Sequence, residues 1–155
     1  MNTIEVRPAS DAELPAVADL RWRWAAENQG RPATTYDEFI QWFVEWAQRN
    51  TEGHRCLVAV RDETVLGMAW LATTPRVPSP LALVRASGDV QCVYVCPEYR
   101  NSGIGGRLVD GILALAESLG LKRVTVHSSE RAVRAYTRSG FTASPQLLQA
   151  DPRNH

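Results

Sequence analysis

Apolar and polar positions follow clear periods along much of the 155-residue chain. Alternation over residues 3–8, TIEVRP, predicts a first strand that ends at Pro8. Helical spacing predicts two helices after it, the first capped by Ser10 or Asp11 and with Pro15 tolerated in its first turns. The apolar stripes are Leu14, Val17, Leu20 and Trp24 in the first helix and Tyr36, Phe39, Ile40, Phe43, Val44 and Ala47 in the second.

Three segments of strand character and one loop come next. The runs RCLVAVRD, residues 55–62, and TVLGMAWLATT, residues 64–74, are β-type and predict an antiparallel hairpin with its turn at residues 62–63. Residues 75–88 contain three prolines, which favours a loop. DVQCVYV, residues 89–95, then predicts another strand.

The last third of the chain alternates helices and strands. The elements are a helix over residues 102–119 followed by Gly120, a strand over 122–128, a helix capped by Ser128 or Ser129 and ended by Gly140, and a strand over 146–150. This order predicts an α/β fold: a mixed, mostly antiparallel central sheet with helices on both faces. The unit from Val90 to His127 should place its two strands in parallel, with a right-handed crossover.

Composition narrows the class of protein. The length and the 45% hydrophobic content predict a single domain over residues 1–155. Seventeen basic residues balance 17 acidic ones with no basic block, which argues against nucleic-acid binding. Without a leader pattern or a long apolar run, we expect a soluble cytoplasmic protein with no membrane partner. Cys56, Cys92 and Cys96 lack the spacing of a zinc site or disulfide framework, so we expect buried thiols and no metal.

The segment Arg100 to Gly106, RNSGIGG, lies where a strand hands over to a helix. Leu108 stands where a dinucleotide fingerprint needs its third glycine, and no Gly-Lys-Ser/Thr of a P-loop is present. Glycines here let the backbone approach an anion, which the free N–H groups of a helix N-terminus favour. Taken alone, the glycines indicate a turn and a pyrophosphate cradle about equally.

Three motifs in order resemble the GNAT superfamily of acyl-CoA-dependent N-acetyltransferases. Arg100 to Gly105 is similar to its Gln/Arg-x-x-Gly-x-Gly/Ala loop, and CVYV with CPEYR resembles the strand and turn before it. SSERAVRAYTRSGF resembles its last conserved helix, with Tyr136 and Gly140 in register. Ser129 stands where the family often has Asn, and the short C-terminus leaves little room for the usual final hairpin.

The resemblance implies acetyl-CoA as co-substrate and a set of residues that would bind it. Main-chain groups of Val93, Tyr94 and Val95 would bind the pantetheine arm, with a strand irregularity there aiming an N–H at the thioester carbonyl. Ser129 would lie beside the same arm. The pyrophosphate would be held by Arg100, Asn101, Ser102, Gly103, Ile104, Gly105 and Gly106.

In register with the family helix, Tyr136 is the predicted general acid, because a phenol stays protonated at neutral pH and can protonate a departing thiolate. Asp89 is the predicted base, since strict alternation would place it on one strand face with Val93 and Val95; a water chain is the alternative. His127, at the end of the strand over residues 122–128, could relay a proton, although a lone histidine there is more often structural. Glu98, in the turn after the strand over residues 89–95, is interpreted as a surface or cap residue. Cys92 and Cys96 have no histidine nearby in sequence to form a thiolate, which favours direct transfer over an acetyl-cysteine relay.

The two N-terminal helices would shape the acceptor site, and they hold four of the five tryptophans. Most of these rings should pack the helices onto the sheet; any that face the pocket would suit an amine on an apolar or planar body. We therefore expect an acetyltransferase acting on a small-molecule amine. A protein acetyltransferase and a non-catalytic acyl-CoA-binding regulatory module are the open alternatives, and so is a homodimer.

Overall fold

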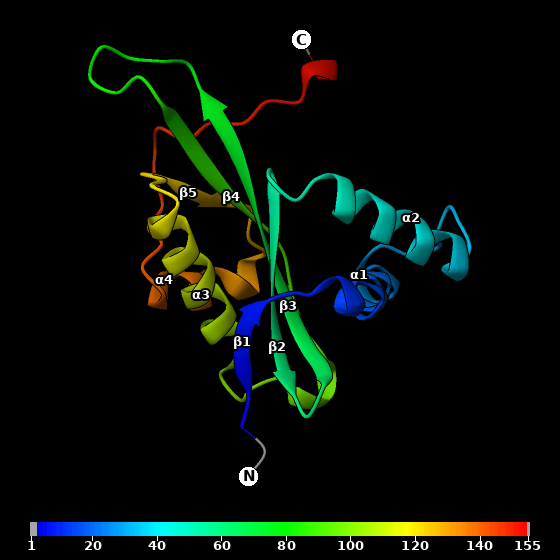
Figure 1. The fold of residues 1–155 in the computed structure, drawn as a ribbon. Coiled ribbons are helices and arrows are strands. Elements are labelled where there is room, and N and C mark those ends of the chain that lie inside the picture. The colour runs from blue at the N-terminus through cyan, green and yellow to red at the C-terminus, as the bar shows by residue number, and fades with distance from the viewer. Residues whose placement is uncertain (1–2, 155) are drawn as a thin grey trace.

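The computed structural model describes residues 3–154, which form a mixed five-stranded sheet with helices against both faces (Figure 1). The strands are β1 (Glu5–Pro8), β2 (His54–Arg61), β3 (Thr64–Arg76), β4 (Arg85–Val95) and β5 (Val124–Val126). They lie side by side in chain order; β1 to β4 are antiparallel, and β5 runs parallel to β4. The predicted fold class and the parallel pair are confirmed.

The main helices are α1 (Leu14–Asn28), α2 (Tyr36–Arg49), α3 (Ile104–Ser118) and α4 (Val133–Arg138). Short 3-10 turns precede α1 at Asp11–Glu13 and α4 at Glu130–Ala132, and others lie at Pro97–Tyr99 and Pro152–Asn154. α1 and α2 share a core with one sheet face, α3 packs on the other, and α4 lies beside α3 (Figure 1). The apolar stripes of α1 and α3 face the sheet, whereas α2 packs mainly on α1 and reaches the core through the C-terminal half of its stripe.

Hydrogen bonds fix the entry into α1 and the glycines fix two helix ends. The backbone N–H of Ser10 donates to Glu13 Oε1 at 2.9 Å, and Arg7 on β1 makes two bonds to the Glu13 carboxylate, at 2.8 and 2.7 Å. Gly120 and Gly140 have φ of 75° and 111°, as predicted for helix ends that need positive φ. The ion pair between Arg7 and Glu13 links β1 to the start of α1.

The loop predicted over residues 75–88 is wrong for most of its length. β3 continues to Arg76 and β4 begins at Arg85, so the two strands project together beyond the sheet and only eight residues form the tip (Figure 1). Pro75 is tolerated because β2 pairs with β3 only as far as Ala72, which leaves the next residues of β3 with one neighbour strand. The tip exposes Val77, Leu81, Leu83 and Val84.

Three further expectations are wrong. Residues 146–150 form no strand, and Leu147 and Leu148 are exposed, because the three-residue β5 offers little edge for pairing. Ser129 stands at the N-cap position before α4, yet its side chain makes no capping bond. Cys92 is exposed, whereas Cys96 is buried and Cys56 partly buried.

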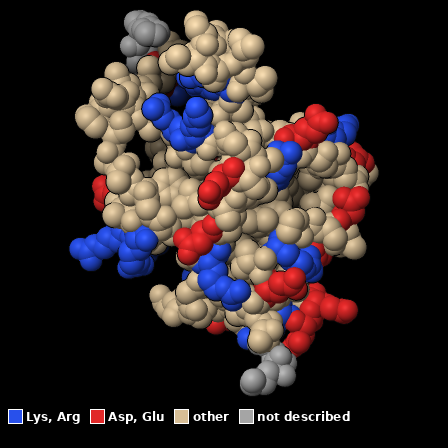
Figure 2. Space-filling model, turned by 60° about the vertical axis from the view of Figure 1, so that its left-hand side comes forward, with Lys and Arg blue, Asp and Glu red and all other residues tan. Residues whose placement is uncertain are grey.

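The distribution of charge, the length of the helices and the grouping of side chains bear on other classes of protein. Basic and acidic side chains are interspersed over the face shown in Figure 2. Among residues 3–154 no helix is both long and apolar enough to cross a membrane. The same residues contain no group of three or more His, Cys, Asp or Glu side chains placed to hold a metal ion.

Candidate active site

A β-bulge interrupts β4 at the centre of the sheet. Tyr94 pairs with Met68 and Gln91 pairs with Trp70, so Cys92 and Val93 together oppose the single residue between those partners. Cys92 has φ of 57°, a conformation in which non-glycine residues are uncommon. The expected strand irregularity is therefore present, and it lies immediately before Tyr94.

The bulge changes which side chains share a face. The extra residue breaks the alternation, so Asp89 and Gln91 lie on the α1/α2 face with Tyr94, while Val93 and Val95 join the core under α3. The predicted grouping of Asp89 with Val93 and Val95 is therefore wrong. Asp89 is partly buried, and its two oxygens accept bonds from Gln91 Nε2 and Thr125 Oγ1, each at 3.1 Å.

Beyond the bulge, β4 and β5 separate. Their ladder covers only Gly88–Val90 against Val124–Val126, so the edge of Gln91–Val95 that turns toward β5 is not paired with it. Unpaired main-chain groups on such an edge are available to a bound chain-like ligand. The structure thus places Val93, Tyr94 and Val95 along an open strand edge.

The glycine loop lies at the start of α3, directly after this edge. Asn101 and Gly103 both have positive φ, 65° and 85°, and Gly103 forms the N-cap of the helix without a side-chain cap. The first main-chain bond into this turn runs from Arg107 N–H to Gly103 O. In the described part of the chain, the N–H groups of Ile104, Gly105 and Gly106 have no acceptor, which makes this end an anion site by its own electrostatics.

Gly105 and Gly106 distinguish a cradle from a simple turn. Both lie inside α3 with ordinary negative φ, so the backbone does not require glycine at either position. A Cβ at Gly105 would meet only Val95 Cγ2 at 3.9 Å, an ordinary contact, and at Gly106 it would meet nothing within 4 Å. The open space in front of these residues fits a bulky anionic group, and it favours the cradle.

The side chain of Arg100 turns away from the glycines. Its Nε donates to Val95 O at 2.8 Å, and its Nη2 donates to Glu27 Oε2 at 3.0 Å. The other oxygen of Glu27 accepts the Tyr94 hydroxyl at 2.6 Å. Burial and this carboxylate raise the pKa of Tyr94 to about 12, and the Tyr94 bond lowers the pKa of Glu27.

Glu27 contacts the candidate site, and the sequence did not predict its hydrogen-bond partners, Tyr94 and Arg100. It lies at the end of α1, 67 residues before Tyr94, and it links α1 to both β4 and the glycine loop. Nothing local in the sequence signals a contact of that range. The helix that borders the acceptor side and the loop on the donor side are therefore held by one carboxylate.

Tyr136 lies on α4 with its ring edge-on to Phe141, at 5.5 Å between centroids and 76° between planes. Burial raises the pKa of its phenol, and a thiolate at Cys92 would raise the pKa further, which places Tyr136 within electrostatic reach of the bulge. Its phenol therefore stays protonated over a wide pH range.

The other residues named from the sequence, Glu98, His127 and Ser129, are exposed. Glu98 is exposed and pairs with Arg23 at 3.4 Å, consistent with a surface residue. His127 and Ser129 are both exposed, directly after β5. The backbone carbonyl of Ser129 is occupied, since it accepts from Ala132 N–H at 3.0 Å.

The aromatic rings of the N-terminal helices mostly pack on one another and on the sheet. Trp22 contacts Tyr36 at 5.4 Å, and Trp46 lies 6.1 Å from Trp70 on β3 and 4.8 Å from His54 on β2. Arg21 stacks on Trp24 at 4.4 Å. These rings form the wall that α1 and α2 present above Asp89 and Gln91.

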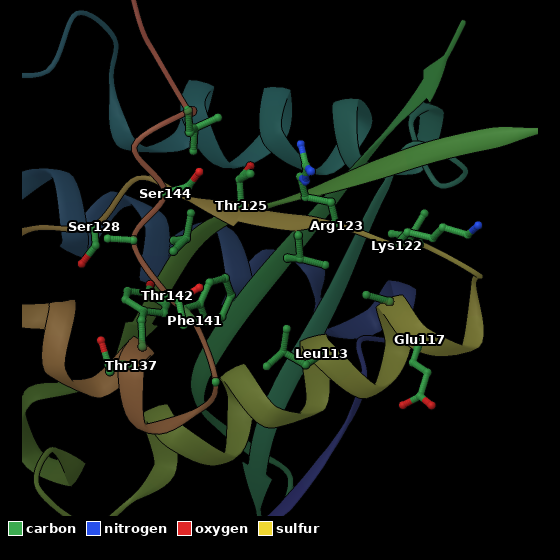
Figure 3. Close-up of a pocket in the computed structure, with 18 of the residues that line it drawn as sticks. Leu113, Glu117, Lys122, Arg123, Thr125, Ser128, Thr137, Phe141, Thr142 and Ser144 are labelled. Atoms are coloured by element: carbon green, nitrogen blue, oxygen red, sulfur yellow. The ribbon is translucent and has the colours of Figure 1, made fainter. Parts of the chain in front are cut away.

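A cavity of about 860 Å³ lies between the C-terminal half of α3, β5 and the chain after α4 (Figure 3). Leu113, Thr125 and Phe141 line it, and Tyr136 borders it from α4. Residues of the segment 144–147 line it as well, and this segment forms no strand in the structure. The missing strand therefore leaves this flank of the sheet open.

Solved structures share this fold. A predicted acetyltransferase with acetyl-CoA from Clostridium acetobutylicum has a TM-score of 0.77 at 17% identity, covering 99% of each chain. Glucosamine-6-phosphate N-acetyltransferase from Arabidopsis thaliana has a TM-score of 0.73 at 14% identity, covering 96% of this chain and 98% of that one. At such identities the likeness establishes the fold, over nearly the whole of each chain.

The family follows from the sequence match. The model of the acetyltransferase (GNAT) family matches residues 15–141, so the chain belongs to this family, as its motifs predicted. Glucosamine 6-phosphate N-acetyltransferase from Trypanosoma brucei brucei is 33% identical over 67 residues. That match covers 43% of this chain and 46% of the relative, so the chain spans about half the length of this curated relative.

Proposed function

We propose that this protein transfers the acetyl group of acetyl-CoA directly to the primary amine of a small molecule. The observation that carries the proposal is that two sets of unpaired main-chain N–H groups follow each other along the chain. One set lies on the open edge of β4, and the other lies at the start of α3. The first suits an extended amide-containing arm, and the second suits a pyrophosphate. Coenzyme A contains both groups in one molecule.

The thioester supplies an activated acyl group, and the residues of this chain supply position and protons. Main-chain N–H groups near the bulge would donate to the thioester carbonyl oxygen as negative charge develops there, an effect typically worth about 3 kcal/mol. Tyr136 would give its phenolic proton to the departing sulfur. Asp89, directly or through water, would take the proton that the attacking amine loses.

Direct transfer is favoured over a cysteine relay. Desolvation raises the pKa of both Cys92 and Cys96, so each is held as a neutral thiol. Arg23 donates to Cys96 Sγ at 3.5 Å, but Cys96 is buried beneath α1 and cannot meet a thioester on the open edge of β4. One transfer step from sulfur to nitrogen needs neither thiol.

A small molecule is the proposed acceptor because the relatives named above act on an amino sugar phosphate. The test is thiol release from acetyl-CoA with a panel of amino sugars, their phosphates, polyamines, aminoglycosides and lysine peptides, with product masses measured. We expect acetylation of a small amine. Turnover restricted to peptides would favour a protein acetyltransferase, and acetyl-CoA binding without turnover on any amine would favour a regulatory module.

A further inference from the structure

One charged side chain lies within the buried stripe of α1. Arg21 is four residues after Val17 and three before Trp24, so it shares the face that packs on the sheet. The Arg21 side chain is partly buried, and its Nη1 nitrogen is fully buried with no hydrogen-bond partner among residues 3–154. Buried charged groups are expensive unless they are paired, so such a group requires a physical explanation.

The local contacts of Arg21 do not supply that partner. Its guanidinium stacks on the Trp24 ring at 4.4 Å, which engages the face of the group and leaves its in-plane N–H donors free. Within residues 3–154 no Asp or Glu forms an ion pair with Arg21. By contrast Arg23, two residues on, is paired with Cys96 Sγ and Glu98.

The position of Arg21 relates it to the proposed reaction centre. α1 packs against β3 and β4, and the charge of Arg21 acts on the pKa of the Cys92 thiol at the bulge, against the larger effect of burial. A second buried donor without a partner, Trp70 Nε1, lies on the same sheet face, and Trp70 is the cross-strand neighbour of Gln91. Two unpaired N–H donors therefore lie on the acceptor side of the bulge.

We infer that Arg21 determines acceptor specificity by binding an anionic group, a phosphate or a carboxylate, that the acceptor carries in addition to its amine. The inference rests on the proposed function. A guanidinium has the planar donor geometry that these anions match. Asp89 lies on the same face with both oxygens bonded only to neutral donors, so the site offers a separate carboxylate for the ammonium group.

The experiment compares matched acceptors with and without the anion. One pair is glucosamine 6-phosphate and glucosamine, and the other is lysine and cadaverine, which differ in a carboxylate. For wild type we expect kcat/KM to be about ten- to a hundredfold higher for the anionic member of one pair, the range of a charged hydrogen bond. Which pair shows the preference identifies the anion.

The variant Arg21→Gln should abolish that preference by raising KM for the anionic acceptor, with KM for acetyl-CoA unchanged. Arg23→Gln is the matched control, because it removes a paired arginine from the same helix and should keep the preference. Thermal unfolding separates structure from recognition: Arg21→Gln should unfold at the same or a higher temperature, since it removes an unpaired buried charge.

Binding of the same compounds to the coenzyme A complex, measured by calorimetry, keeps the inference testable without turnover. Weaker binding of the anionic member to Arg21→Gln than to wild type supports it. Equal preference in wild type and Arg21→Gln, in rate or in binding, overturns it and leaves the proposed acetyl transfer standing. Absence of turnover with every amine, while acetyl-CoA binds, would instead remove the proposed function.

Discussion

Gly105 and Gly106 differ from Gly103 and Gly111, the glycines on either side of them in and before α3, because neither backbone angle nor packing explains them. Gly103 is needed for its φ of 85°, and Gly111 is needed because a Cβ there would lie 3.0 Å from Leu57 Cδ1. Glycine is a poor helix former, so keeping two at the start of α3 costs stability. A ligand that approaches the backbone accounts for that cost.

The pair Gly106→Ala and Gly111→Ala tests this difference. Gly106→Ala should raise stability by up to about 1 kcal/mol, because alanine is the better helix former, and should weaken acetyl-CoA binding about tenfold by crowding the cradle. Gly111→Ala should lower stability by about 1–3 kcal/mol through overpacking, with the acetyl-CoA Kd retained. Thermal unfolding and calorimetry measure both quantities. An unchanged Kd in Gly106→Ala would contradict the cradle at that residue.

Tyr136 gives a prediction in pH. Burial raises the pKa of its phenol, so the proton-donating form persists above the ordinary value of about 10, and the alkaline limb of kcat should be displaced upward. Tyr136→Phe should lower kcat about a hundredfold, remove that limb and leave the acetyl-CoA Kd unchanged. Rate profiles between pH 6 and 11 provide the check. Equal kcat in both proteins would end the assignment of Tyr136 as the acid.

Among the elements, helices and strands with strong periods were predicted correctly, whereas the irregularity in β4 was implied only by the family resemblance, and the residue pattern did not mark its position. The apolar repeat in α3 coincides with its buried residues, that in α2 marks the side that packs on α1 and the core, and Gly120 and Gly140 have the positive φ predicted for helix ends. Cys92 adopts positive φ without being glycine, so no residue type marked where alternation would break, and the face of Asp89 was assigned wrongly.

Hydrogen bonds between elements far apart in the chain could not be predicted from the sequence either. The bonds of Glu27 to Tyr94 and Arg100 join residues about seventy positions apart, and only the fold brings them together. Arg21 did carry a local signal, because its spacing from Val17 puts a charge inside an apolar stripe. Sequence motifs were enough to predict the candidate acid and the glycine loop, whereas the residues on the acceptor side could be identified only from the three-dimensional structure.

The junction between β1 and α1 makes a prediction about acid stability. Arg7 holds the pKa of Glu13 down from 4.5 to about 2, so the unfolded chain binds the proton more tightly than the folded one. The stabilisation is present above pH 4.5 and is lost as the pH falls toward about 2. Glu13→Gln should therefore unfold at a lower temperature than wild type near pH 7, and the difference should shrink steadily in acid.

Glu5→Gln is the control for this prediction, because Glu5 approaches Arg7 only at 3.7 Å and its side chain is 68% exposed. Its unfolding temperature should follow that of wild type at every pH. A constant difference between Glu13→Gln and wild type across the acid range would show that the Arg7 pair does not set the acid limb.

For the whole molecule, the sheet divides the two halves of the proposed reaction. The donor half comprises the open edge of β4, the start of α3 and Tyr136 on α4, while α1 and α2 cover the acceptor half on the opposite face with Asp89, Trp70 and Arg21. The bulge at Cys92 is the point where β4 serves both. The cavity beside β5 adjoins the donor half at Tyr136 and extends away from the glycine loop, along the C-terminal half of α3 (Figure 3).

Hydrogen–deuterium exchange with and without coenzyme A tests the proposed donor site most directly. The N–H groups of residues 91–95 and 104–106 include those without partners in the free protein, so bound ligand should slow their exchange, while the hairpin tip at residues 77–84 stays unchanged. Protection confined to the cavity between α3, β5 and residues 141–147, with none at the glycine loop, would contradict the proposed site.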